Sequence, residues 1–73
     1  MIERRVYHVL RRRDDSWQVI REGFQRPHIV RDYKEEAVLL AKRLAKDGPG
    51  ALVIVHGSDN LVERQFSYTA GSL

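Results

Sequence analysis

Hydrophobic and polar residues alternate in two stretches near the start of the chain. Residues 5–10, Arg-Val-Tyr-His-Val-Leu, and residues 17–21, Trp-Gln-Val-Ile-Arg, are rich in the β-branched and aromatic side chains that are typical of strands. Between them, the run from Arg13 to Ser16 supplies short polar side chains that favour a turn. The pattern predicts a β-hairpin. A short third strand is predicted from Pro27 to about Val30 or Arg31, because proline is tolerated at the first position of a strand.

The periodicity changes after Asp32. Apolar residues then recur at spacings of three and four, which places them on one stripe of a helix: Ala37, Val38, Leu40, Ala41, Leu44 and Ala45. Asp32 and Glu35 have the spacing of a capping box, and Gly48 and Pro49 are typical of a helix end. The sequence therefore predicts a helix from about Tyr33 to Asp47.

Two further strands complete the predicted fold. Residues 51–56 are almost continuously apolar, residues 57–60 (Gly-Ser-Asp-Asn) favour a turn, and residues 61–66 alternate again. The resulting βββ-α-ββ order predicts an α+β domain, in which about five strands form an antiparallel sheet with one helix packed on one face. We expect a single domain over residues 1–73, with an ordered core at about 5–68 and a loose tail at 69–73.

Both faces of the first hairpin carry apolar residues. Because successive strand side chains point in opposite directions, one face is predicted to hold Tyr7, Val9, Trp17 and Val19. The other is predicted to hold Val6, His8, Leu10 and Ile20. One helix covers only one face, so the second face is expected to meet another subunit, the final hairpin or a partner protein; alternatively, its apolar residues are simply tolerated at the surface. A cysteine-free core in a chain of 73 residues is small, which favours a homodimer.

The basic residues are ten arginines and three lysines, and the net charge is +3. Arginine suits phosphate recognition because its guanidinium group offers a planar fork of donors. Our first hypothesis is a non-catalytic module that contacts DNA or RNA through arginines of the first three strands: Arg11, Arg12, Arg13, Arg21, Arg26 and Arg31. The alternative is a protein-interaction or structural module that works through an apolar sheet face as a homo-oligomer, with Val6, His8, Leu10 and Ile20 at the interface.

The sequence contains no pattern typical of a catalytic or metal-binding site. The histidines, His8, His28 and His56, have no helical metal-ligand spacing, so a structural role is favoured for them and no metal is expected. Serines and threonines fall in predicted turns or in the tail, and no nucleophile motif is present. We therefore expect no enzyme activity and no cofactor. No apolar run approaches the length of a membrane span, and the absence of a signal-peptide pattern favours a soluble, cytoplasmic protein.

Several short motifs together resemble domain of unknown function 2188, a family of small prokaryotic proteins. They are Tyr7-His8-Val9-Leu10, Trp17-Gln18-Val19, Gly23, Arg26, the helix entry Tyr33-Lys34-Glu35-Glu36-Ala37, Ala41, Leu44-Ala45-Lys46 and Val55-His56-Gly57. The resemblance extends from about Tyr7 to Tyr68. Two positions depart from the family pattern: Arg11 stands where a proline is common, and Asn60 where a glycine is usual. The resemblance implies a fold but no activity, since the family has no established function.

Overall fold

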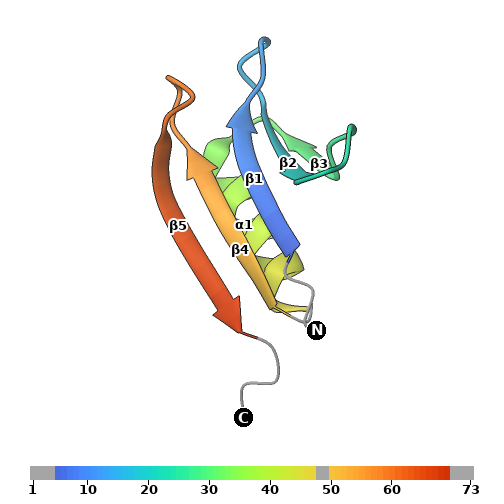
Figure 1. The fold of residues 1–73 in the computed structure, drawn as a ribbon. Helices are drawn as coiled ribbons and strands as arrows, with labels where there is room; N and C mark the ends of the chain where they lie inside the picture. The colour runs from blue at the N-terminus through green and yellow to red at the C-terminus, as the bar shows by residue number, and fades with distance from the viewer. Residues whose placement is uncertain (1–4, 48–49, 70–73) are drawn as a thin grey trace.

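Three consecutive strands form a meander on one side of the sheet (Figure 1). A computed structural model describes residues 5–47 and 50–69. In it β1 (Arg5–Arg11) pairs antiparallel with β2 (Trp17–Arg21), and β2 pairs antiparallel with β3 (Ile29–Arg31). The predicted hairpin is confirmed. The third strand is shorter than predicted, since it begins at Ile29 and not at Pro27.

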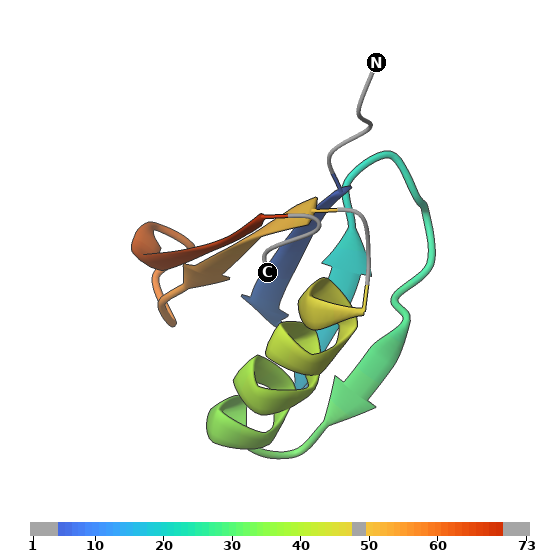
Figure 2. The ribbon, with the colours of Figure 1, turned by 90° about the horizontal axis from the view of Figure 1, so that it is seen from below.

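A single helix, α1 (Lys34–Lys46), follows β3 and packs on one face of the sheet (Figure 2). Glu35 and Glu36 lie in its first turn and Lys46 in its last, where they complement the helix dipole. The predicted capping box is wrong. The N-cap residue is Tyr33, one position after Asp32, and no side chain caps the helix.

The chain returns after α1 to the edge of β1. There β4 (Gly50–His56) pairs with β1, and β5 (Val62–Thr69) pairs antiparallel with β4, so the strand order is β3-β2-β1-β4-β5. The predicted α+β class with five strands is confirmed, but the sheet is mixed. The pair β1–β4 is parallel, because α1 carries the chain back to the end of the sheet at which β1 begins. The predicted tail lies outside the described residues, except for Thr69 in β5.

The core lies between α1 and the sheet. Four valines from the three central strands are fully buried: Val9, Val19, Val53 and Val55. They face three buried alanines of the helix, Ala37, Ala41 and Ala45, whose small side chains let the helix approach the sheet closely. Within the part of the chain that is described, no helix is long and apolar enough to cross a membrane.

Both hairpin turns contain a residue in the left-handed region, Asp15 with φ of 68° and Asn60 with φ of 71°. Aspartate and asparagine adopt this region more readily than most residues. In the first turn, Asp14 also accepts hydrogen bonds from the backbone N–H and the hydroxyl of Ser16. These bonds confirm that short polar side chains stabilise this turn.

Candidate functional site: the open face of the sheet

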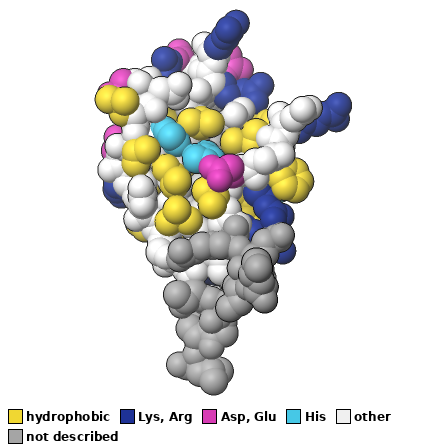
Figure 3. All heavy atoms as spheres, viewed as in Figure 1, with side chains coloured by type: hydrophobic (Ala, Val, Ile, Leu, Met, Phe, Trp, Pro, Cys, Tyr) yellow, Lys and Arg dark blue, Asp and Glu magenta, His cyan; other side chains and the backbone are white. Residues whose placement is uncertain are grey.

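The face of the sheet opposite α1 is not covered by any described element, and apolar side chains form a band across it (Figure 3). Residues directly opposite each other on paired strands point to the same face, so the pairing defines this set. Its half-buried aliphatic members come from the three central strands: Val6, Leu10, Ile20, Leu52 and Ile54. Val30 of β3 and Val62 of β5 extend the band toward the two edges and are 41% and 55% exposed. We call this surface the open face.

Two histidines lie in the middle of the open face. His8 is on β1, the central strand of the sheet, and His56 ends the adjacent strand β4. His8 Nδ1 lies 3.1 Å from His56 Nε2, and the ring centroids are 5.3 Å apart. The β1–β4 pairing brings these residues together although they are far apart in the sequence.

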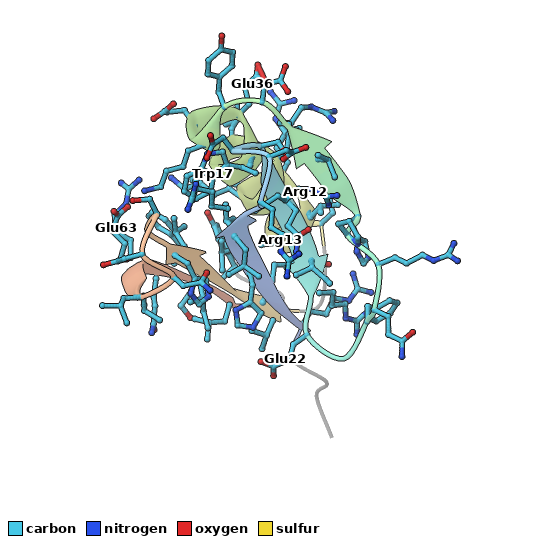
Figure 4. All side chains as sticks on the ribbon, turned by 90° about the horizontal axis from the view of Figure 1, so that it is seen from above. Arg12, Arg13, Trp17, Glu22, Glu36 and Glu63 are labelled. Carbon is cyan, nitrogen blue, oxygen red and sulfur yellow. The ribbon has the colours of Figure 1, made fainter. Side chains whose placement is uncertain are left out.

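The outer nitrogen of each ring contacts an oxygen acceptor. His8 Nε2 lies 3.0 Å from Glu22 Oε1, and His56 Nδ1 lies 3.2 Å from the carbonyl oxygen of Asn60. Seen from the hairpin end, Glu22 lies on the side of the sheet away from α1 (Figure 4). The result is a chain of four groups, from the Glu22 carboxylate through both imidazoles to the Asn60 carbonyl.

The arginines of the strands lie on the opposite side. Each is paired with a residue that faces α1: Arg5 with Ala51, Arg21 with Tyr7, Arg11 and Arg31 with Trp17, and Arg64 with Val55. Strand alternation therefore leaves the open face without a strand arginine within residues 5–11, 17–21, 29–31, 50–56 and 62–69.

Three consecutive arginines lie at the end of β1 and in the turn that follows it, and Arg12 and Arg13 are labelled in Figure 4. Arg11, Arg12 and Arg13 line two adjoining hollows with Asn60, the larger of about 510 Å³. Arg11 forms an ion pair with Asp15, and Arg12 Nη1 donates to Gln18 Oε1 at 2.9 Å. Arg13 has no side-chain partner among the residues that the structure describes.

The model of a family described as "Uncharacterized protein conserved in bacteria (DUF2188)" matches residues 7–68. The chain belongs to this family. No curated protein and no solved structure matches it. The family match confirms the resemblance found in the sequence and brings no activity with it.

In this DUF2188 chain the four residues predicted at an interface share the open face: Val6, His8, Leu10 and Ile20. Whether that face contacts a partner stays a prediction. Sequence reasoning did not include Leu52, Ile54, His56 or Glu22 in the set. The parallel pairing of β1 with β4 is what places the three β4 residues there.

The six arginines of the nucleic-acid hypothesis do not form one surface. Only Arg11, Arg12 and Arg13 line a common hollow. The guanidinium carbon of Arg21 lies 5.1 Å from the centre of the Phe24 ring, and Arg26 is exposed in the loop before β3. Arg31 Nη1 donates to the Val30 carbonyl oxygen at 2.8 Å.

Proposed function

We propose that this protein is a non-catalytic interaction module that self-associates through its open face. The observation that carries the proposal is the apolar band on the side of the sheet opposite α1. An antiparallel or mixed sheet with one solvated face normally alternates apolar and polar residues. Here the alternation places aliphatic residues on both faces of β1 and β4.

The size of the open face sets the strength of contact expected. Five strands spaced about 4.8 Å apart, each contributing about five residues at about 3.3 Å, cover roughly 400 Å². Two such faces in contact remove roughly 800 Å² from water, which is below the roughly 1,000 Å² of a stable interface and in the range of weak, transient contacts. We therefore expect a dimer that forms at micromolar rather than nanomolar protein concentration.

Charge restricts how a second copy of this chain can meet the open face. Each chain carries a net charge of +3, so two copies repel each other wherever arginines meet. The strand arginines point away from the open face, whose central groups are two histidines and Glu22. Two copies that meet through the centre of this face therefore keep their strand arginines apart, whereas Arg12, which donates to Gln18, lies at the hairpin end of the face and limits the contact there.

Sedimentation velocity over a range of protein concentrations tests the proposal. We expect the wild type to shift from monomer to dimer as concentration rises, and Ile20→Glu to stay monomeric because it places a charge in the apolar band. Leu39→Glu is the matched control, since Leu39 is 52% exposed on α1 and lies outside the open face. A wild type that is monomeric at high micromolar concentration overturns the proposal. Circular dichroism establishes that both variants are folded.

A second candidate function, contact with nucleic acid, is supported by the hollow that Arg11, Arg12 and Arg13 share. Adjacent parallel strands whose onward connections diverge leave a crevice at their carboxyl ends. β1 and β4 have this arrangement, since β2 and β5 lie on opposite sides of the pair. Guanidinium groups in such a crevice are suited to phosphate oxygens.

Fluorescence anisotropy with labelled duplex DNA, single-stranded DNA and RNA, at low and moderate salt, tests this second candidate. We expect weak binding that falls with salt, with a slope of about −2 on logarithmic axes if two or three phosphates are contacted. Replacing Arg12 and Arg13 together with alanine should remove most of the binding, whereas Arg26→Ala should have little effect. Equal loss in both variants would show that the charge acts non-specifically and that the hollow is not the site.

A further inference from the structure

The contacts of His8 and His56 determine which ring nitrogens carry protons. An ionised carboxylate and a carbonyl oxygen can only accept hydrogen bonds. His8 must therefore donate its Nε2–H to Glu22, and His56 must donate its Nδ1–H to the Asn60 carbonyl. In neutral imidazoles these are the only ring N–H groups. The lone pairs of His8 Nδ1 and His56 Nε2 then face each other across 3.1 Å.

Two facing lone pairs repel unless a cation lies between them. Three contacts join Glu22, the two histidine rings and the Asn60 carbonyl in a row. Two neutral rings supply protons for only two of these contacts. A third proton makes one imidazole cationic, and a metal ion satisfies both lone pairs while both rings remain neutral. Metal-bound histidines usually donate their other N–H to a carboxylate or a backbone carbonyl. His8 and His56 each have such a partner.

We propose that His8 and His56 form half of a transition-metal site of the zinc or copper class, which the same two histidines of a second copy complete across the open face. This inference rests on the proposed self-association. Neutral imidazole nitrogens suit Zn²⁺ and Cu²⁺. Two nitrogens about 2.0–2.1 Å from a tetrahedral Zn²⁺ are about 3.3 Å apart. The separation of the pair therefore has to grow by only a few tenths of an ångström, while both rings tilt so that their lone pairs converge on an ion beside the line that joins the nitrogens.

The number and position of the ligands favour completion by a second copy. Within residues 5–47 and 50–69, no group of three or more histidine and carboxylate ligands is present, so one chain supplies two ligands where zinc usually takes four. Glu22 contacts the outer nitrogen of His8 and therefore supports the ring instead of binding the metal. Across the width of the sheet, the histidines lie on β1, the central strand, and on its neighbour β4. A two-fold axis near the centre of the open face would bring four imidazoles together.

The test is isothermal titration of the metal-free protein with ZnCl₂ at about pH 8, where free imidazole is neutral, combined with sedimentation in EDTA and in Zn²⁺. We expect one Zn²⁺ per two chains and a dimer that is at least ten times tighter with Zn²⁺ than with EDTA. His8→Ala and His56→Ala should each abolish Zn²⁺ binding, and His28→Ala should bind as the wild type does. Glu22→Gln should weaken binding by about 10- to 100-fold, because Glu22 orients His8.

The outcomes separate this inference from the proposed function. A wild type that dimerises in EDTA but does not bind Zn²⁺ overturns the metal site and leaves self-association intact, with a proton between the rings. Zn²⁺ binding at one ion per monomer, without dimerisation, overturns the shared site and counts against self-association. Zn²⁺ binding that survives in both histidine variants also overturns the site. His8 is half-buried, so its replacement can disturb the fold, and circular dichroism is recorded for each variant to establish that it is folded. If only one of the two histidine variants folds, that variant is enough for the test.

Discussion

At the scale of single residues, hydrogen bonds in the turn between β1 and β2 change the ionisation of the Asp14 carboxyl group. The Ser16 hydroxyl and then the Ser16 backbone N–H hold the pKa of Asp14 below its ordinary value, since both stabilise the ionised carboxylate. Because the pKa of Asp14 is lower in the folded state than in the unfolded state, its hydrogen bonds to Ser16 stabilise the fold at pH values above the unfolded pKa. That contribution is lost as the pH falls through the folded pKa.

Replacing Ser16 with alanine tests this assignment. The hydroxyl bond is removed while the backbone N–H bond remains possible, so the pKa of Asp14 should rise part of the way to its ordinary value of 3.8. NMR titration of the Asp14 side-chain carboxyl measures the change. Ser58→Ala, in the other hairpin turn, should leave the Asp14 titration as it is in the wild type. An unchanged Asp14 curve in Ser16→Ala would show that the hydroxyl does not act on this carboxylate.

At the scale of elements, the start of α1 is a weak point. Tyr33 is at the N-cap in an extended conformation, with φ of −118° and ψ of 139°, and supplies no capping bond. Serine in this position can accept a bond from a first-turn amide.

We therefore expect Tyr33→Ser to raise the free energy of unfolding by about 0.5–1 kcal/mol, as measured in urea. The aromatic ring is 68% exposed, so little packing is lost. Asp32→Ala is the informative control. It should change stability little if Tyr33 is the N-cap, and should lower it by about 1 kcal/mol if Asp32 caps the helix after all.

The elements themselves were largely predictable because each has a local signal. Alternation located β1 and β2 with their ends nearly correct, and the three-four spacing located α1. The direction of β4 was not predictable from such patterns. A nearly continuous apolar strand such as residues 51–56 is compatible with either direction, and only the path of the chain over the sheet decides between them.

The same limit explains what was missed at the candidate site. Alternation within one hairpin placed Val6, His8, Leu10 and Ile20 on one face, and the structure agrees with that placement. His8 and His56 meet through a pairing between distant segments. A search for metal ligands at helical spacings cannot detect such a pair, because those spacings describe neighbours on one helix.

At the scale of the whole molecule, two kinds of surface adjoin each other. The aliphatic open face lies opposite α1, and the arginine-lined hollow adjoins it at the hairpin end of the sheet. Leu10 belongs to both surfaces, and Gln18, which pairs with Leu10, also lines the hollow. Self-association over the whole open face would therefore cover one wall of the hollow, so the two proposed activities compete at this end of the sheet.

The parallel contact between β1 and β4 also has a consequence for how the protein is made. Arg5 of β1 pairs with Ala51 of β4. During synthesis, one edge of β1 therefore stays unpaired until β4 has been made. Translation adds about 5–20 residues per second, which leaves an apolar strand edge open for seconds. Such an edge is a template for pairing with other chains. We therefore expect rapid docking of β4 on β1 to shorten the time during which the nascent protein can aggregate.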